Sequence, residues 1–448
     1  MSITNISENT VGIFGLGYIG LPFTAALASV GFDVIGCDVD KEKIRNLKKT
    51  YRVNIHEPGL NETFERFKDR IKFTTDEKEL MNNTSKILVT VGTPLKNDRT
   101  PDYNSINSCI ESIGKNLKKE QLIIFKSTVV PGTTEEYVAP KLKELSGLEP
   151  GKDFYLAYSP ERTIEGMALY EIYNLPKIVG GINQESTNRA ASVLEKLGGS
   201  VIKVSCTKVA EICKITDNLY RATNIALANE LGMICEKNNI DAHEVVNAVN
   251  NAYERTKIFT PGLGADGPCL TKDPEILRYH ALQKNVEIPI IEHGIKMNNY
   301  ATLRIADIVS DFIERNNNKV DKISFLGLAF KGHPETDDVR GSPAISIYNK
   351  LKDKIDNMNV GLYDPLVKRV FDKDTHERFE DSINDANIVM LLTNHKKLMN
   401  IDVKEILEKT KRPLLIVDCW HNLKGVENLN EEGVEVFRIG HGWMKNNK

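Results

Sequence analysis

The fold is decided by a glycine-rich stretch at residues 11–20, VGIFGLGYIG. A short apolar run leads into three glycines spaced GxGxxG, and the helix-like sequence LPFTAALASV follows. In such a strand–turn–helix the first glycine permits the tight turn, and the second lets a pyrophosphate approach the backbone. The third allows the helix to pack closely against the strand. The spacing therefore predicts a dinucleotide-binding βαβ unit built on Gly15, Gly17 and Gly20.

Asp38 follows the next strand-like run and lies eighteen residues after Gly20. A carboxylate at this place accepts hydrogen bonds from a ribose 2′-OH and repels a 2′-phosphate, so it favours NAD over NADP. The alternative is a turn that only packs, with a solvated Asp38.

Apolar runs alternate with helix-like segments up to about residue 204, and each run is bounded by glycine, proline or charge, as buried parallel strands are. The runs are VGIFG (11–15), FDVIGC (32–37), KILVTVG (86–92), QLIIFK (121–126) and DFYLAY (153–158). This alternation predicts a doubly wound parallel sheet.

From Thr207 the chain changes character. Residues 207–237 contain no strand-like run and no proline, which predicts one long amphipathic helix. Further helical segments lie on either side of a Gly/Pro-rich loop at 260–269. From about Val320 the strand–helix rhythm returns, and GLAFKG at 327–332 echoes the first glycine-rich turn.

We therefore expect an α/β protein with two Rossmann-like doubly wound domains joined by a central all-helical domain. The expected boundaries are 1–205 for the NAD-binding domain, 206–316 for the helical domain and 317–448 for the second nucleotide-binding domain.

The composition excludes several classes of protein. The 448 residues carry a net charge of −3, so no positive field attracts nucleic acid or a membrane. The start, MSITNISENT, lacks the pattern of a secretory signal, and no apolar run approaches the ~20 residues of a membrane span. Seven cysteines without a CxxC pair argue against a disulfide scaffold or a zinc module. We expect a cytoplasmic protein with reduced thiols and no metal.

Cys269 lies in a glycine-rich loop, GLGADGPCLTKDP (262–274). We expect a helix from Thr271, whose N-terminus would favour the thiolate, and we expect Asp273 to share the pocket. The alternative is a buried loop cysteine beside a helix-capping Asp273. The other six cysteines fall in strand or helix patterns, where a small buried hydrophobe is the default; they are Cys37, Cys109, Cys206, Cys213, Cys235 and Cys419.

Lys214 and Asn218 lie four residues apart on the long predicted helix and therefore share a face. Buried, such a pair would stabilise an oxyanion by charge and by a hydrogen bond. Taken alone, the spacing favours a solvated stripe.

Together these segments resemble the UDP-sugar 6-dehydrogenases, the family of UDP-glucose and UDP-N-acetylhexosamine dehydrogenases. The matches run along almost the whole chain and include KSTVVPGT, SPERTIEGMAL, AEICKITDNLYRATNIALANE, PGLGADGPCLTKDP and GLAFKGHPETDDVRGSPA. The resemblance implies oxidation of the sugar C6 alcohol to a carboxylate with two NAD⁺, and a second nucleotide-binding domain that holds UDP.

The resemblance also implies a role for each matched residue. Cys269 would trap the C6 aldehyde as a thiohemiacetal, and loss of a second hydride would give a thioester that water cleaves. Lys214 and Asn218 would stabilise the oxyanion, and Asp273 would position water and Lys214. Glu161 would serve in acid–base chemistry or activate water, with Glu165 and Thr128 as its active-site partners.

The remaining implied residues contact cofactor or substrate. The cofactor set is Gly15, Gly17, Tyr18, Ile19, Gly20, Asp38, Lys43, Thr93, Thr128 and Arg340. The substrate set is Arg162, Lys214, Asn218, Arg255, Gly262, Gly264, Gly267 and Lys331. In the family Arg255 reaches a neighbouring subunit and Arg340 contacts cofactor across domains; a surface ion pair is the alternative for each.

The chain departs from the family pattern at Asp266 and Pro268, where the cysteine loop usually reads GxGGxC, and at Gly341, where the family often has Glu. Arg162 in SPER resembles the branch that oxidises UDP-N-acetylhexosamines, with UDP-N-acetylmannosamine favoured. The alternatives are a UDP-glucose 6-dehydrogenase, a two-electron β-hydroxyacid dehydrogenase and a non-catalytic NAD-binding regulator. The apolar surface of residues 206–237 predicts a homodimer or a higher homo-oligomer.

Overall fold

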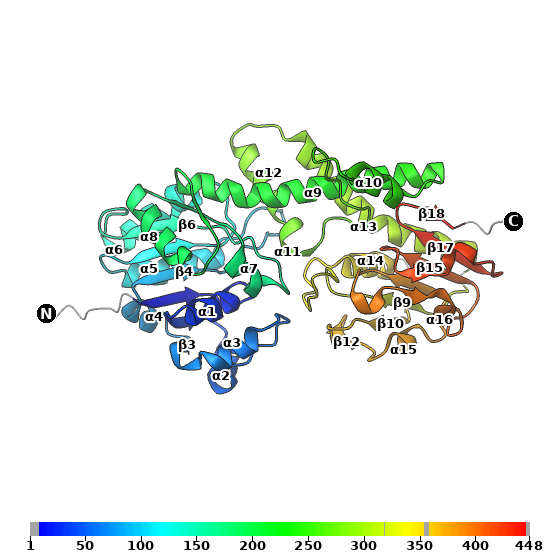
Figure 1. The fold of residues 1–448 in the computed structure, drawn as a ribbon, viewed down its shortest axis with the longest axis horizontal. Helices are drawn as coiled ribbons and strands as arrows, with labels where there is room; N and C mark the ends of the chain where they lie inside the picture. Colours follow the sequence, from blue (N-terminus) through cyan, green and yellow to red (C-terminus); the bar gives the residue numbers. More distant parts are fainter. Residues whose placement is uncertain (1–8, 318, 354–357, 445–448) are drawn as a thin grey trace. The chain divides into compact units, whose positions relative to one another are not determined.

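The computed structural model describes residues 9–317, 319–353 and 358–444, and the chain forms two compact units (Figure 1). Unit 1 comprises Met1–Asp217 and Glu275–Val286, and unit 2 comprises Asn218–Pro274 and Glu287–Lys448. The first eight residues, within the segment predicted not to be a signal, and the Lys/Asn-rich residues 445–448 lie outside the described part. The three domain boundaries expected from the sequence stay a prediction.

Unit 1 is built on an eight-stranded sheet of order β3-β2-β1-β4-β5-β6-β7-β8. All neighbouring strands are parallel except β6 and β7. The strands are β1 (Thr10–Phe14), β2 (Asp33–Cys37), β3 (Ile71–Thr74), β4 (Lys86–Val89), β5 (Leu122–Phe125), β6 (Tyr155–Tyr158), β7 (Lys177–Gly181) and β8 (Val201–Lys203). The expected doubly wound sheet is therefore confirmed.

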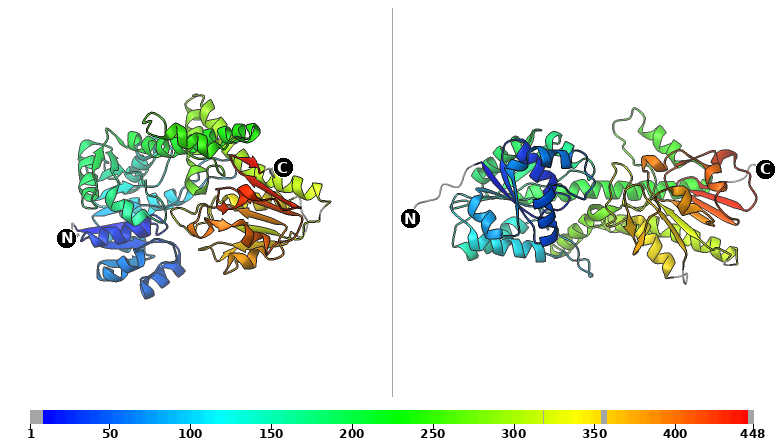
Figure 2. Two further views of the ribbon diagram at one scale, coloured as in Figure 1. Left: turned by 45° about the vertical axis from the view of Figure 1, so that its right-hand side comes forward. Right: turned by 90° about the horizontal axis from the view of Figure 1, so that it is seen from below.

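Helices cover both faces of this sheet, and an apolar cluster lies on each face (Figure 2). They are α1 (Gly20–Ser29), α2 (Lys41–Thr50), α3 (Leu60–Arg66), α4 (Glu77–Asn83), α5 (Asn104–Asn116), α6 (Ala139–Ser146), α7 (Ala168–Asn174) and α8 (Gln184–Glu195). Helix α12 (Asp273–Gln283) begins in unit 2 and continues in unit 1. A π-helical turn at Thr134–Val138 precedes α6. Local chemistry fixes several starts: the carboxylate of Asp40 accepts hydrogen bonds from two backbone amides of α2, and Asp76 does the same for α4.

Unit 2 contains a six-stranded sheet of order β10-β9-β13-β15-β17-β18, parallel except for β18. Its strands are β9 (Ile323–Leu326), β10 (Val360–Tyr363), β13 (Ile388–Leu391), β15 (Leu414–Asp418), β17 (Val434–Arg438) and β18 (Gly442–Trp443). Its helices are α10 (Ala242–Asn250), α11 (Gly267–Leu270), α13 (Pro289–Arg315), α14 (Pro343–Lys352), α15 (Phe379–Ile383) and α16 (Val403–Leu407). The long helix α9 (Thr207–Asn238) begins in unit 1 and ends in unit 2. None of the helices in the described residues combines the length and apolar composition that a membrane span requires.

The echo between the two glycine-rich turns extends to their hydrogen bonds. Gly15 and Gly327 both have φ +91°, a left-handed conformation that glycine adopts without strain. The Leu16 amide donates to Asp38 at 2.8 Å, and the Leu328 amide donates to Asp364 at 2.7 Å. The turns then diverge, because α14 begins only at Pro343.

The structure differs from the sequence-based expectations at several elements. Two short strands, β3 and β8, carry exposed polar residues, so neither forms a continuous apolar run. The helix expected from Thr271 begins instead at Asp273, and Cys269 lies inside the four-residue helix α11. Cys213 on α9 is half-buried and packs against an apolar cluster of unit 1, in line with the expected packing role. The expectation was wrong for Cys206, which is half-buried and lies outside any helix or strand.

Candidate active site

The glycine loop of unit 1 has the shape that a pyrophosphate needs. A Cβ atom added to Gly20 would lie 1.9 Å from the carbonyl oxygen of Gly15, so only glycine lets α1 pack against the turn. A Cβ atom added to Gly17 would meet nothing within 4 Å, because this glycine faces open space. Tyr18 and Ile19, which lie between Gly17 and Gly20 in the chain, are half-buried. The backbone amides at the start of α1 are thus open to an anionic ligand.

Asp38 lies at the end of β2, beside this loop. Its carboxylate accepts hydrogen bonds from the backbone amides of Leu16 at 2.8 Å and Asp40 at 3.0 Å, and it pairs with Lys43 Nζ at 3.0 Å. Burial by itself raises the pKa of Asp38, but these donors outweigh it and lower the pKa. The ionised carboxylate fits an NAD ribose and opposes the 2′-phosphate of NADP. At the neighbouring strand ends, the Thr93 hydroxyl donates to the carbonyl oxygen of Thr128 at 2.6 Å.

Glu161 follows β6 and is buried, with 7% of its surface exposed. One carboxylate oxygen accepts hydrogen bonds from the backbone amides of Arg162 at 2.9 Å and Thr163 at 2.8 Å. The other faces the ammonium group of Lys126 at 3.3 Å. Sequence reasoning missed Lys126, although its place directly before Ser127-Thr128, at the carboxyl end of a parallel strand, marks it as a candidate.

Two further predicted residues of unit 1 lie close to this turn. Arg162 is half-buried, and its Nε pairs with Asp217 on α9 at 2.7 Å. Glu165 is also half-buried.

In unit 2 the cysteine loop lies beside a buried polar pair. Cys269 is exposed. Asp273, at the start of α12, is fully buried, and its carboxylate accepts hydrogen bonds from Asn218 Nδ2 at 2.6 Å and Lys272 Nζ at 2.8 Å. Asp273 is therefore a partner of Asn218 rather than a simple helix cap.

Lys214 and Asn218 lie one turn apart on α9, and they are 8% and 5% exposed. The solvated stripe that their spacing alone favoured is therefore wrong, and the buried alternative holds.

The glycines of the cysteine loop lie against backbone and side-chain groups of unit 2. A Cβ atom on Gly264 would lie 2.0 Å from the carbonyl oxygen of Asn298, and one on Gly267 would lie 2.6 Å from the Phe330 ring. The amide of Gly262 donates to Asn229 Oδ1 at 3.1 Å. The Gly267 amide donates to the carbonyl oxygen of Gly341 at 3.0 Å. Gly341 has φ +65°, and a Cβ atom there would lie 2.9 Å from the carbonyl group of Gly267, which explains the glycine at 341.

The cationic residues expected to bind ligands have partners within unit 2. Lys331 Nζ donates to the carbonyl oxygen of Pro334 at 2.7 Å. The Arg340 guanidinium pairs with Asp338 at 2.6 Å. Arg255 is exposed and lies over the Tyr253 ring at 4.8 Å. Their assignments to substrate and cofactor stay predictions.

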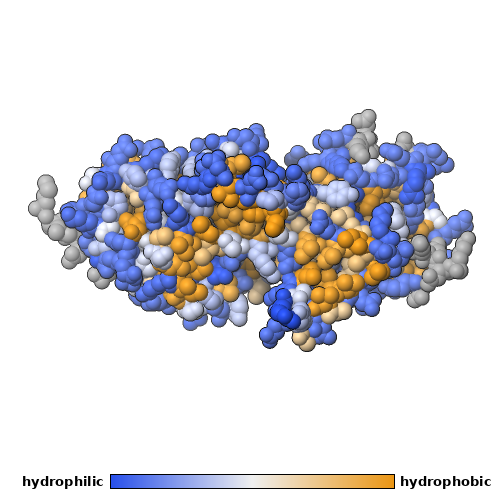
Figure 3. All heavy atoms as spheres, turned by 90° about the horizontal axis from the view of Figure 1, so that it is seen from above, coloured by the Kyte–Doolittle hydropathy of each residue, from blue (hydrophilic) through white to orange (hydrophobic). Residues whose placement is uncertain are grey.

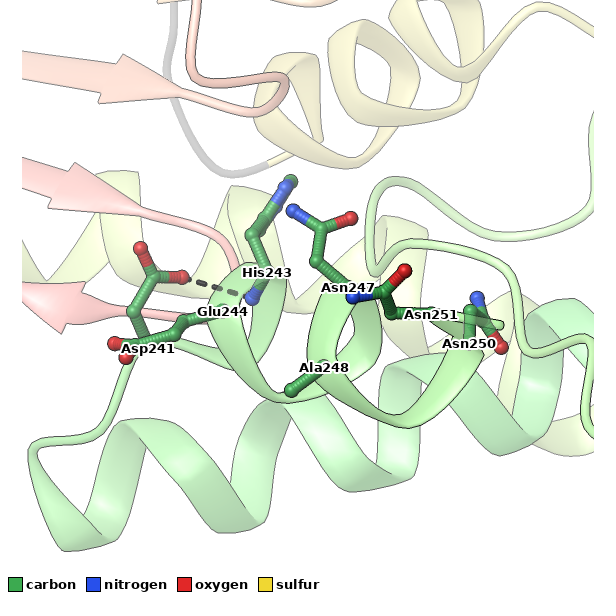
Figure 4. Close-up of a pocket in the computed structure, with 7 residues that line it drawn as sticks. All are labelled: Asp241, His243, Glu244, Asn247, Ala248, Asn250 and Asn251. Atoms are coloured by element: carbon green, nitrogen blue, oxygen red, sulfur yellow. Dashed lines mark hydrogen bonds between the residues drawn. The ribbon is translucent and has the colours of Figure 1, made fainter. Parts of the chain in front are cut away.

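A pocket of unit 2 contains none of the predicted residues (Figure 4). It is lined by α10 and its flanks: Asp241, His243, Glu244, Asn247, Ala248, Asn250 and Asn251. His243 stacks on His421, with ring centroids 3.7 Å apart. We do not assign the activity to this pocket.

The comparison with known families decides the identity. The three domain models of one family match in order: its NAD-binding domain at residues 9–197, its central domain at 208–300 and its UDP-binding domain at 324–425. The chain belongs to the UDP-glucose/GDP-mannose dehydrogenase family. The expected oxidoreductase class, NAD cofactor and UDP-binding domain are thereby confirmed.

Relatives in this family cover nearly the whole chain. A UDP-N-acetyl-D-mannosamine dehydrogenase of Pyrococcus horikoshii is 31% identical over 92% of this chain and 96% of its own length. A GDP-mannose 6-dehydrogenase of Pseudomonas savastanoi pv. phaseolicola is 31% identical over 97% of each chain. The solved structure of the UDP-N-acetyl-mannosamine dehydrogenase from Staphylococcus aureus matches with a TM-score of 0.81 and 30% identity, over 96% of this chain and 98% of that one.

Proposed function

We propose that this dehydrogenase oxidises the C6 alcohol of a UDP-N-acetylhexosamine, with UDP-N-acetyl-D-mannosamine favoured, to the uronate through a thioester on Cys269. The observation that carries the proposal is the cysteine loop of unit 2, where an exposed thiol follows a glycine-rich turn beside the buried Asn218–Asp273 pair. A thiolate is the side-chain nucleophile best suited to trap an aldehyde near neutral pH.

The proposed reaction has two oxidations separated by a covalent step. When bound, NAD⁺ supplies the hydride acceptor. After the first oxidation the Cys269 thiolate adds to the C6 aldehyde and forms the thiohemiacetal. Lys214 and Asn218 stabilise its oxyanion by charge and by a hydrogen bond. The second oxidation leaves the thioester, and water attacks its carbonyl carbon so that the C–S bond breaks and the uronate leaves. The family resemblance supplies these roles.

Two features support the choice of an N-acetylhexosamine. Relatives with this substrate in their names match the chain nearly end to end. Arg162 belongs to the SPER motif of that branch, and its guanidinium is fixed by Asp217. Half-buried Asp266 adds a side chain to the cysteine loop, and burial raises the pKa of this carboxyl well above its usual range.

The decisive experiment measures how many NADH molecules form per nucleotide sugar consumed. The substrates are UDP-N-acetylmannosamine, UDP-N-acetylglucosamine, UDP-N-acetylgalactosamine, UDP-glucose and GDP-mannose. We expect two NADH per sugar and the highest kcat/KM on an N-acetylhexosamine. One NADH per sugar would refute the thioester route, and a tenfold higher kcat/KM on UDP-glucose or GDP-mannose would refute the substrate assignment.

We further propose a homodimer built on α9. Tyr220, Leu227 and Ile234 are spaced by seven residues, so they share one face, and they are 55%, 46% and 59% exposed. Apolar side chains also gather on the face of the molecule that includes α9 (Figure 3). Light scattering should give twice the mass of the 50.3 kDa chain, and Leu227→Asp should give the monomer.

All seven cysteines are free, which supports a reducing, cytoplasmic environment.

A further inference from the structure

We propose that Lys126 is a positioning residue that holds Glu161 as an ionised proton acceptor. The inference rests on the proposed function and adds to it the direction in which Glu161 moves a proton. Lys126 follows β5 and Glu161 follows β6, which is the next parallel strand of the sheet. Both side chains are buried, with 2% and 8% of their surfaces exposed.

The surroundings of Glu161 consist of hydrogen-bond donors. Among the described residues its carboxylate meets the amides of Arg162 and Thr163, the Thr163 hydroxyl and the Lys126 ammonium. Three of these groups, the two amides and the ammonium, can only donate, so they favour the ionised carboxylate over the protonated carboxyl. Burial alone would raise the pKa of Glu161, but Lys126 and the amides lower it. Glu161 is therefore prepared to accept a proton rather than to donate one.

Lys126 is itself fixed from three sides. Its Nζ donates to the carbonyl oxygen of Ser159 at 3.2 Å, faces Glu161 at 3.3 Å and lies 4.4 Å from the centroid of the Phe23 ring. Phe23 belongs to α1, the helix that follows the glycine loop. A buried ammonium needs such partners, because its desolvation is compensated only by a nearby negative charge and by acceptors.

The family resemblance gives Glu161 the activation of water, and an ionised carboxylate suits that role because it can accept the proton. Water attacks the thioester carbonyl carbon and forms the C–O bond, while one water proton passes to the Glu161 carboxylate. The C–S bond then breaks, and its electron pair leaves on the sulfur of Cys269. The second proton goes to solvent when the uronic acid ionises. Lys126 touches neither the sulfur nor the sugar in this scheme and acts only through Glu161.

The pH profile of kcat tests this role. In Lys126→Met the buried carboxyl loses its counter-charge and becomes protonated near neutral pH. We expect kcat at pH 7 to fall on the order of a hundredfold and to recover about tenfold per pH unit as the pH rises. Lys126→Arg should keep the wild-type pH dependence. Lys72→Met, which removes an exposed lysine paired with Glu79 in the same unit, should change nothing.

A second pair of variants separates positioning from folding. Glu161→Gln should lower kcat at every pH, and adding Lys126→Met to it should cost nothing more, because Lys126 acts through Glu161. The double variant buries no unpaired charge, so its folding where Lys126→Met alone fails to fold would also support the proposal. A wild-type pH profile in Lys126→Met, or a uniform loss without recovery, would overturn it.

An infrared measurement keeps the test independent of the proposed function. Burial raises the pKa of Glu211 to about 7 and that of Asp266 well above its usual range, so both carboxyls contribute a C=O stretch of a protonated acid in every variant. Lys126→Met at pH 7 should show an additional C=O stretch in the difference spectrum against the wild type, and the double variant should not. The absence of this additional stretch from folded Lys126→Met would overturn the role of Lys126. If Lys126→Met shows the additional stretch but the wild type forms no NADH from any nucleotide sugar, the proposed function alone is refuted.

Discussion

Glu211 on α9 is a buried carboxyl group that we expect to make unit 1 less stable as the pH rises. It is 0% exposed, and its oxygens accept hydrogen bonds from the Gly132 amide at 2.5 Å, the Thr134 amide at 2.9 Å and the Thr134 hydroxyl at 2.6 Å. These contacts hold the start of the π-helical turn against α9. Burial outweighs them and raises the pKa of Glu211 to about 7.

The size and sign of the effect follow from this shift. In the unfolded chain Glu211 titrates near its ordinary pKa of 4.5, so its pKa is about 2.5 higher in the folded state than in the unfolded state. At ~1.4 kcal/mol per unit the difference is about 3 kcal/mol. This stability is fully present below pH 4.5, is lost as the pH rises to about 7 and does not change further above that pH. The glutamine in Glu211→Gln cannot titrate, so this variant should abolish the fall in stability with rising pH. Any change in stability that the amide itself causes is the same at every pH.

The assay is urea unfolding followed by circular dichroism between pH 5 and pH 8. Both tryptophans, Trp420 and Trp443, lie in unit 2, so tryptophan fluorescence records that unit separately. The wild-type midpoint of the unit 1 transition should fall by about 1 M urea over this range, and the Glu211→Gln midpoint should not.

Glu136→Gln is the matched control, because Glu136 lies in the same π-helical turn but is exposed. A hydrogen bond from Lys208 lowers the pKa of Glu136, so this group stays ionised throughout the range. Equal slopes in the wild type and Glu211→Gln would refute the reasoning.

Three further predictions concern the cofactor loop and the nucleophile. Gly20→Ala should destabilise unit 1 by about 2 kcal/mol or more in thermal unfolding, because its Cβ would clash with a carbonyl oxygen. Gly17→Ala should leave Tm unchanged, and a fluorescence titration should show NADH binding weakened on the order of tenfold. Asp38→Ser should raise the ratio of kcat/KM for NADP over NAD on the order of tenfold, and an unchanged ratio would contradict the role of the carboxylate. Cys269→Ala should lower steady-state NADH formation on the order of a thousandfold while NADH binding persists, and full activity would contradict the thioester.

Much of the fold follows from local sequence patterns. The GxGxxG turn is predictable because the requirement for glycine at each place lies within a few residues. The central strands are predictable because a strand covered on both faces is apolar throughout, as β5 is. β8 was not predictable in this way, since it lies at the sheet edge with two exposed residues, and its pairing with β7 defines it.

Some residues of the candidate site were likewise predictable from the sequence, and others were not. Cys269 and Asp38 stand out by their place in a loop or after a strand. The sequence left open whether Lys214 and Asn218 are buried, because an i, i+4 spacing on a helix is the same for a solvated and a buried face. The place of Lys126 after a strand marks it as a candidate, but its pairing with Glu161 could not be predicted, since Glu161 belongs to another strand.

The sequence by itself determined the two nucleotide-binding sheets, the long helix, NAD as cofactor and the residues that the family resemblance marks. These properties depend on periodicity, glycine positions and motifs, all of which are read over short stretches of chain. Only the tertiary structure decided which buried charges have partners: Glu211 contacts Gly132 across 79 positions of chain, and Asn218 contacts Asp273 across 55. A buried carboxyl takes its protonation state from the groups that folding brings within hydrogen-bonding distance, and no local pattern specifies those groups.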